Sequence, residues 1–180
     1  MDGYADGGGL SMKKRIPLAL IAVILLTGLD QLVKYLVNKN FEVGESRKLI
    51  DGIFQLSYIQ NRGAAWGSFS GKIVFLLVIT FAILIAAIYV YIKLAGISGR
   101  KYTPIRIPMV FLISGAIGNM IDRIFRGYVV DMFDFCLINF PVFNVADIYV
   151  TCSFIVIVIL ILFVYKDEDL SVILRGKKDK

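Results

Sequence analysis

The sequence predicts an all-α polytopic membrane protein, a bundle of four transmembrane helices with a small extracytoplasmic β-cradle between its first two spans. Hydrophobic residues make up 58% of the 180-residue chain, and the mean hydropathy is +0.76. A soluble domain of this length cannot bury so much apolar surface, because ordinary domains contain only about 45–50% apolar residues. Four long apolar runs and one short segment of alternating polarity supply the predicted elements.

Each apolar run can cross a hydrocarbon core of about 30 Å, which takes about 20 helical residues. The first run covers residues 17–37, and Pro17 suits the first turn of a helix, where its missing N–H has no partner. The second run, 73–92, contains no charged residue. The third and fourth runs cover residues 105–125 and 148–165. The chain is therefore predicted to cross the membrane four times.

The polar N-terminal segment MDGYADGGGLS, residues 1–11, precedes a second methionine and a basic triplet. Such a glycine-rich start is typical of an expression scar or a misassigned start, and we expect it to lie outside the fold. No small-residue cleavage site follows the first apolar run, which indicates a retained span and not a signal peptide. Residues 12–180 are then expected to form a single four-span membrane domain.

Lysine and arginine residues are distributed unequally between the two sides of the predicted bundle. Twelve lie on the side of both termini and seven on the other, with Lys34 inside the first span. Cytoplasmic loops carry the excess, so both termini are predicted to be cytoplasmic, with segments 38–72 and 126–147 outside. In the first outer segment, FQLSYIQN (54–61) alternates apolar and polar residues after the turn-bounded GESRKLIDG (44–52). This pattern predicts a short hairpin or sheet on the membrane surface.

The composition excludes several classes of function. The chain contains no histidine, which excludes Ser-His-Asp triads and HExxH zinc sites. Cys136 and Cys152 lack the spacing of metal ligands, and we expect neither a metal nor a cofactor. The net charge is +6, but the basic residues cluster at the ends of apolar runs instead of alternating with aromatics. That placement argues against nucleic-acid binding.

Polar residues from distant parts of the sequence are predicted to lie at one membrane depth, on the outer side. Ionisable groups within a membrane are costly and usually face the bundle interior, where they mark a functional site. The inner halves of the spans carry almost nothing comparable. The asymmetry therefore predicts one polar site on the outer side. Its candidate residues are Asp30, Lys34, Asn61, Asn119, Asp122, Arg123, Asp131, Asn144 and Asp147.

A pair of carboxylates is the natural source of acid–base chemistry in a chain without histidine or a metal motif. Two carboxyl groups held close together share one proton, so that one acts as acid and the other as base. Asp147 is predicted in the first turn of the fourth span, where the helix dipole favours its anion by roughly 0.3–1 kcal/mol. Asp131, in RGYVVDMFDF (126–135), is a candidate for the partner that keeps the proton; the sequence leaves open which of the two is protonated at rest, and the pair would titrate as a unit.

The residues alone leave other interpretations open. Asp30 and Lys34 are spaced i,i+4 and are also explained as an ion pair within one helix. Asn144 and Asp147 also fit a capping box, with Asp in place of the usual Glu. The same carboxylates suit a small proton- or cation-coupled transporter. Lys34 and Ser114 are the only membrane candidates for a serine–lysine protease.

Four motifs, in order, resemble those of the bacterial lipoprotein signal peptidases, or type II signal peptidases, which are membrane aspartic proteases. The motifs are DQLVKYLV (30–37), NRGAAWGSF (61–69), GNMIDRIFRGYVVDMFDF (118–135) and FNVAD (143–147). The resemblance implies an aspartic endopeptidase of the bacterial cytoplasmic membrane with its active site on the extracytoplasmic side. Its implied substrates are diacylglyceryl-modified prolipoproteins, cut just before the lipidated lipobox cysteine.

The same resemblance implies roles for individual residues. Asp131 and Asp147 would be the catalytic pair, and Asp134 a solvated or structural neighbour. Met132 stands where an aromatic residue is common, which is expected to affect the shape of the pocket and not the pair. Membrane-lipid contacts, a monomer and sensitivity to globomycin-type cyclic peptides are also implied. The implied substrate-binding and supporting residues are Asn61, Gly63, Asn119, Asp122, Arg123, Asn144, Ala146, Asp30 and Lys34.

Overall fold

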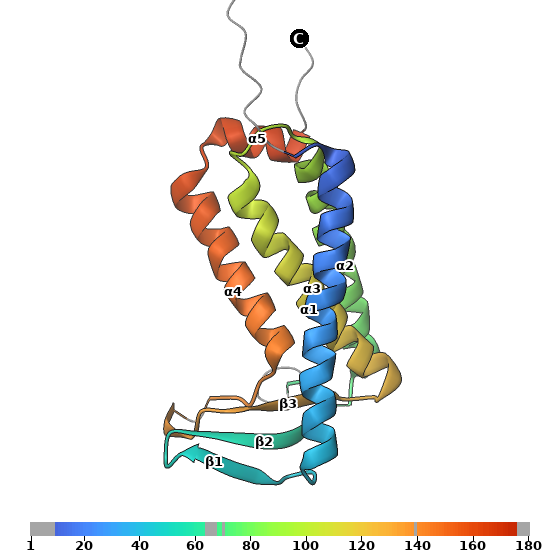
Figure 1. Cartoon of the computed structure of the whole chain (residues 1–180), viewed down its shortest axis with the longest axis vertical. Coiled ribbons are helices and arrows are strands. Elements are labelled where there is room, and N and C mark those ends of the chain that lie inside the picture. Colours follow the sequence, from blue (N-terminus) through green and yellow to red (C-terminus); the bar gives the residue numbers. More distant parts are fainter. Residues whose placement is uncertain (1–9, 64–67, 70, 139, 176–180) are drawn as a thin grey trace, which may run out of the picture.

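The computed structural model describes residues 10–63, 68, 69, 71–138 and 140–175, which form a helical bundle with a small sheet at one end (Figure 1). Four of its helices are long and apolar enough to cross a membrane, which confirms the predicted fold class. They are α1 (Met12–Asn40), α2 (Ile73–Gly96), α3 (Thr103–Phe125) and α4 (Val145–Ile159), the last continued by a π-helical turn, η3 (Leu160–Val164).

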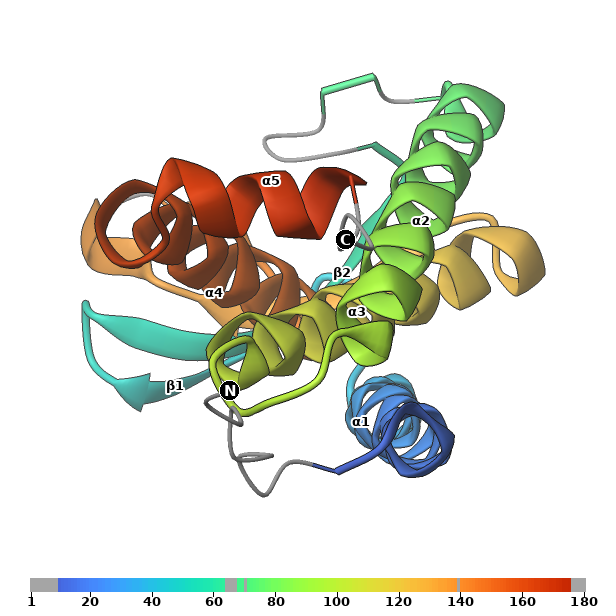
Figure 2. The ribbon, with the colours of Figure 1, turned by 90° about the horizontal axis from the view of Figure 1, so that it is seen from above.

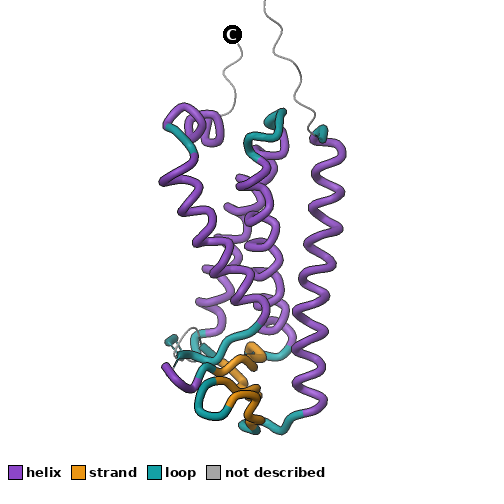
Figure 3. Tube along the Cα trace, turned by 60° about the vertical axis from the view of Figure 1, so that its left-hand side comes forward, coloured by secondary structure: helices purple, strands orange, loops and turns teal. Residues whose placement is uncertain are grey.

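The two ends of the bundle differ in what they carry. One end, here called the sheet end, holds the strands and most of the long connections (Figure 3). The other, the terminal end, holds the start of α1 and a short helix, α5 (Asp167–Arg175), which lies across the bundle (Figure 2). Both termini of the described chain therefore lie on the side opposite the sheet, as an even number of spans requires.

Three helices begin earlier than the apolar runs from which they were predicted, and α3 does so by two residues, at Thr103. α1 starts at Met12, so Pro17 lies inside the helix and the prediction that it occupies the first turn is wrong. The reason is tertiary: Arg15, N-terminal to the proline, donates hydrogen bonds to carbonyl oxygens at the end of α2, which extends α1 toward the N-terminus. α4 starts at Val145, three residues before the predicted span, because Asn144 caps it.

α3 is the central helix of the bundle. It contacts α1, α2 and α4, and 56% of its most apolar stretch is buried, against 11–17% for the other three. Two glycines allow this close packing. A Cβ on Gly115 would lie 2.5 Å from the carbonyl oxygen of Ala146, and one on Gly118 would lie 2.5 Å from Asp30 Oδ2. α1 and α4 therefore approach the same stretch of α3, near the sheet end.

The sheet has three antiparallel strands in the order β1 (Ser46–Ile50), β2 (Phe54–Asn61) and β3 (Val129–Asp134). The β1–β2 hairpin confirms the alternating segment predicted between the first two spans, and its turn places Gly52 at φ +68°, which favours glycine. β3 was not predicted as a strand. It follows α3 in the chain and pairs with β2, placing Ile59 opposite Asp131.

The terminal end contains two buried arginines that hold the C-terminus of α2. Arg15 Nη1 donates to the carbonyl oxygens of Ala95, at 2.9 Å, and Ile97, at 2.6 Å. Arg106 Nε donates to the carbonyl oxygen of Leu94 at 2.9 Å, and its Nη2 to that of Ile97 at 2.6 Å. Cations are favourable at a helix C-terminus, where carbonyl groups lack helical partners. These arginines thus fasten α1 and α3 to the end of α2.

Candidate active site

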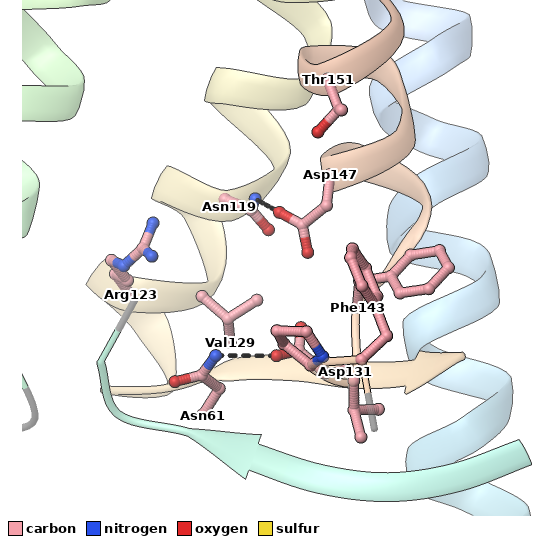
Figure 4. A pocket seen from close by; sticks show the side chains of 11 residues that line it. Asn61, Asn119, Arg123, Val129, Asp131, Phe143, Asp147 and Thr151 are labelled. Atoms are coloured by element: carbon pink, nitrogen blue, oxygen red, sulfur yellow. Dashed lines mark hydrogen bonds between the residues drawn. The ribbon is translucent and has the colours of Figure 1, made fainter. Parts of the chain in front are cut away.

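A pocket of about 280 Å³ lies at the sheet end, between α3, α4, β3 and the loop that leads into α4 (Figure 4). Asp131 and Asp147 both line it, as the sequence predicted for a carboxylate pair. They come from different elements, one from the sheet and one from a helix. The complete lining consists of Asn61, Asn119, Arg123, Val129, Asp131, Phe140, Pro141, Val142, Phe143, Asp147 and Thr151.

Asp131 faces the pocket because side chains alternate along β3. Val129 and Asp131 point to the pocket, whereas Val130 and Met132 are fully buried on the opposite face. Met132 packs there with Tyr58, so its departure from the family pattern falls in the core and not in the pocket, contrary to our expectation for the pocket's shape.

The Asp131 carboxyl group is 2% exposed and held by two amides. Asn144 Nδ2 donates to its Oδ1 at 2.6 Å, and Asn61 Nδ2 donates to its Oδ2 at 2.9 Å. Burial, followed by the nearby charge of Asp147, raises the pKa of Asp131 to about 7. Asp131 is therefore suited to hold a proton at neutral pH.

Asp147 is the third residue of α4 and is fixed by the start of that helix. Asn119 Nδ2 donates to its Oδ1 at 2.7 Å, and the backbone N–H of Asn144 donates to its Oδ2 at 3.1 Å. In return, Asn144 Oδ1 accepts the backbone N–H of Asp147 at 3.0 Å. This reciprocal pair confirms the predicted capping box.

Capping and site formation turn out to be compatible roles for Asn144. Its oxygen caps α4, while its Nδ2 donates both to Asp131 and to Asn119 Oδ1, the latter at 3.2 Å. The side chain is fully buried. Asn144 therefore contacts both carboxyl groups, that of Asp131 through its side-chain amide and that of Asp147 through its backbone N–H.

Adjacent to the pocket lies a buried cluster of three charged side chains, here called the triad, formed by Asp30, Lys34 and Asp122. Lys34 Nζ lies 2.9 Å from Asp30 Oδ2 and 3.0 Å from Asp122 Oδ2, and all three side chains are completely buried. The predicted i,i+4 ion pair is confirmed. Lys34 also donates to Asn119 Oδ1 at 3.0 Å, which connects the triad to an amide that holds Asp147.

The remaining predicted residues take different places. Arg123 lines the pocket, and its Nη2 lies 3.4 Å from the carbonyl oxygen of Gly63. Gly63 itself is not among the lining residues, and neither is Ala146, which is fully buried in the first turn of α4. Asp134 accepts hydrogen bonds from Gln55, at 2.7 Å, and from a serine on β2, and lies outside the pocket lining. Residues 64–67 of the second motif lie outside the described residues.

Several residues in and around the site were not predicted from the sequence. Thr151 follows Asp147 by one helical turn, and this i,i+4 spacing was the available signal. The apolar wall formed by residues 140–143 carried no such signal, because it depends on how the loop folds back. Gln31 was also missed, although it lies within the first motif; its Nε2 lies 3.1 Å from Asp30 Oδ2 and 3.2 Å from Asp122 Oδ1.

The serine–lysine hypothesis does not fit the structure. The Ser114 hydroxyl donates to the carbonyl oxygen of Val110 at 2.7 Å, one turn back in α3. Lys34 is engaged with the triad and Asn119 instead. As for metals, the described part of the chain contains no group of three or more Cys, Asp or Glu side chains arranged to hold an ion.

Comparison with known proteins gives a consistent result. The sequence model of a family described as signal peptidase (SPase) II matches residues 21–163. The lipoprotein signal peptidase of Enterococcus faecalis is 40% identical over 153 residues, which cover 85% of this chain and 89% of that protein. That of Brevibacillus brevis is 41% identical over 161 residues, with 89% and 97% covered.

Solved structures show the same likeness in three dimensions. A bacterial membrane enzyme determined by the in meso method at 2.3 Å resolution has a TM-score of 0.72 and 32% identity, covering 92% of this chain and 94% of its own. A second such enzyme, determined at 1.9 Å resolution, has a TM-score of 0.72 and 35% identity, covering 83% and 96%.

Proposed function

The chain belongs to the signal peptidase II family, and on that basis we propose that Asp131 and Asp147 are its two catalytic carboxyl groups. The protein is a membrane aspartic protease that removes signal peptides from prolipoproteins. One observation carries the assignment: these two side chains, from β3 and α4, line one pocket and are joined through Asn144. The relatives give the transporter hypothesis no support.

In the proposed reaction, Asp131 holds the shared proton and Asp147 is the base. Asp147 removes a proton from a water molecule as the water oxygen attacks the scissile carbonyl carbon, and Asp131 gives its proton to the carbonyl oxygen. When the C–N bond breaks, the leaving amine takes the proton from Asp147, and Asp131 regains one from the gem-diol. The raised pKa of Asp131, about 7, supports this division of roles.

The neighbouring polar groups bind the substrate and orient the pair. Arg123 lines the pocket as a cation able to stabilise charge that develops on the carbonyl oxygen, a role worth about 3–4 kcal/mol for one donor. Asn61 and Asn119 each donate to one catalytic carboxyl group and fix its orientation. Gly63 presents its carbonyl oxygen to Arg123 and contributes to holding it.

The substrate we propose is a prolipoprotein whose lipobox cysteine carries a diacylglyceryl thioether, cut just before that cysteine. The sheet end then faces the outside of the cytoplasmic membrane, because the lysine and arginine excess lies at the terminal end. In this orientation the lipid anchor of the substrate reaches the pocket from the outer leaflet. We further propose that residues 12–180 act as a single-domain monomer, in contact with membrane lipids, and are inhibited by globomycin-type cyclic peptides.

Cleavage of a diacylglyceryl-modified lipobox peptide by the detergent-purified protein tests the assignment. Asp131→Asn and Asp147→Asn should each lower kcat by roughly 10³-fold or more, because either change removes a group that transfers a proton. Asp134→Asn is the matched control and should retain kcat within about twofold. If the wild type does not cleave the peptide, the substrate is wrong; if either of the first two variants cleaves it normally while folded, the pair is wrong.

A further inference from the structure

Each proposed catalytic aspartate is preceded by a residue whose backbone N–H is held by the triad. The N–H of Ala146, just before Asp147, donates to Asp30 Oδ1 at 2.9 Å. The N–H of Val130, just before Asp131, donates to Asp122 Oδ2 at 3.2 Å. The two carboxylates of the triad thus hold the two catalytic segments in the same way.

Lys34 joins these two attachments. Its ammonium group contacts Asp30 and Asp122, so the backbones of α4 and β3 are both fixed relative to one buried cation. Gln31, one residue after Asp30, bridges the same two carboxylates through its Nε2. Asp122 also pairs with Arg126, and its Oδ1 thereby has a further cationic partner. Charges this deeply buried keep a fixed geometry, because leaving one unpaired costs several kcal/mol.

The amide of Asn119 adds a third attachment. Because its Oδ1 accepts a hydrogen bond from the Lys34 ammonium, which can only donate, its Nδ2 must face Asp147. Asn144 Nδ2 donates to the same oxygen at 3.2 Å, so two donors hold the amide in this orientation. The charge of Lys34 therefore helps to fix the position from which Asn119 donates to the proposed catalytic group.

We propose that the Asp30–Lys34–Asp122 triad is a positioning device that sets the separation of the two catalytic carboxyl groups, an inference that rests on the proposed function. None of its three side chains lines the pocket. It acts by fixing the backbone N–H groups of Ala146 and Val130 and the orientation of Asn119.

The separation of the two carboxyl groups has a measurable consequence. Two carboxyl groups held close titrate in two well-separated steps, whereas groups farther apart titrate at nearly the same pH. The bell-shaped dependence of rate on pH should therefore narrow when the triad is broken. The cations that act on the pair are Lys34, on α1, and Arg123, on α3; Asp122, also on α3, acts on Arg123.

The test measures kcat, KM and the pH profile of lipobox-peptide cleavage by the full chain in detergent. Lys34→Met should lower kcat by about 100-fold, the loss typical of an ångström-scale misplacement, with KM changed by less than about threefold. The bell-shaped curve of cleavage rate against pH should be narrower for Lys34→Met than for the wild type. Asp30→Leu should behave alike, whereas Asp30→Asn keeps an acceptor for the N–H of Ala146 and should lose only about tenfold.

A control matched for stability separates positioning from simple loss of folding. Leu94 is fully buried at the terminal end, so Leu94→Ala should lower the thermal midpoint and leave the width of the bell unchanged. An unchanged bell in Lys34→Met, or a rise in KM at constant kcat, overturns the proposal. If Lys34→Met does not fold, the Asp30→Leu and Asp30→Asn pair decides it by the same two measurements. Failure of the proposed function itself is recognised separately, because the wild type would then not cleave.

Discussion

Both ends of the bundle bury charged side chains, but they use them differently. At the terminal end, Arg15 and Arg106 donate to main-chain carbonyl oxygens at the end of α2 and to the loop after it. At the sheet end, carboxyl groups receive hydrogen bonds from side-chain amides, and two of them, on the buried Asp131 and the half-buried Asp147, also face a pocket. Burial of charge alone therefore does not identify a site.

The two ends differ in where the remaining hydrogen-bond positions of their charged side chains point. The arginines hold helices together by donating hydrogen bonds to backbone carbonyl oxygens. The proposed catalytic carboxyl groups, on Asp131 and Asp147, keep acceptor positions that face a cavity large enough for part of a peptide. This difference can be tested by changing each end in turn and measuring stability and turnover separately.

The largest effect on turnover outside the catalytic groups is expected at Gly118. A Cβ there would lie 2.5 Å from Asp30 Oδ2, so Gly118→Ala must displace a carboxylate of the triad. We expect kcat to fall by about 100-fold, as for other small misplacements. Gly28→Ala is the matched control, because nothing lies within 4 Å of a Cβ at Gly28. Equal losses in both variants would show that helix composition, and not the triad, is responsible.

At the terminal end we expect a substitution to lower stability and to leave turnover nearly unchanged. Arg106→Met removes a cation from the C-terminal carbonyl oxygens of α2, and hydrogen bonds to charged groups contribute about 1.5–3 kcal/mol each. The free energy of unfolding should fall by roughly 3 kcal/mol. The kcat per folded molecule should stay within about twofold, measured after correction for the folded fraction. A 100-fold lower kcat would contradict the separation between the two ends.

The burial of Asp131 should also make the stability of the protein depend on pH. The folded pKa of Asp131 is raised from 3.8 to about 7, so its stabilising contribution is complete below pH 3.8 and is lost as pH rises through about 7. Asp131→Asn should therefore increase the free energy of unfolding at pH 8 by at most about 4 kcal/mol, and by less at pH 5. The thermal midpoint, measured at both pH values, should rise accordingly. Gly28→Ala, by contrast, should shift the midpoint equally at both pH values.

The smallest effect is expected at Asp134, three residues after Asp131. It accepts hydrogen bonds from Gln55 and Ser57 across the sheet and does not line the pocket. Asp134→Asn should lower the unfolding free energy by about 1 kcal/mol, and turnover should change by less than twofold. Thermal unfolding and peptide cleavage, measured on the same preparation, give both numbers. A loss of turnover comparable to that of Asp131→Asn would extend the catalytic pair to a third carboxyl group.

Much of the fold could be predicted from sequence because membrane helices depend on composition and length. The four spans, the capping box at Asn144 and the ion pair of Asp30 with Lys34 all rest on residues close together in the chain. β3 could not be found in this way, because both of its faces are partly buried and its partner strand lies far away in sequence. The early start of α1 likewise depends on where Arg15 finds its partners.

The residues of the candidate site were predicted from their type and their depth in the membrane, but the hydrogen bonds between them were not. That Asp131 and Asp147 would line one pocket followed from their common level in the membrane. The bond from Asn144 to Asp131 did not, because a capping asparagine has no sequence feature that reveals a second partner. Nor could Lys34 be linked to Asn119, since that contact requires the packing of α1 on α3.

The pairing of β2 with β3 has a consequence for how the protein is made. Asn61 pairs with Val129, so two transmembrane helices must be synthesised between one strand and its partner. At roughly 5–20 residues per second, one edge of β2 remains unpaired for several seconds of translation. Asp147 is made later still. A ribosome-bound chain therefore has no complete site, and we expect the nascent enzyme to be inactive until its fourth span has entered the membrane.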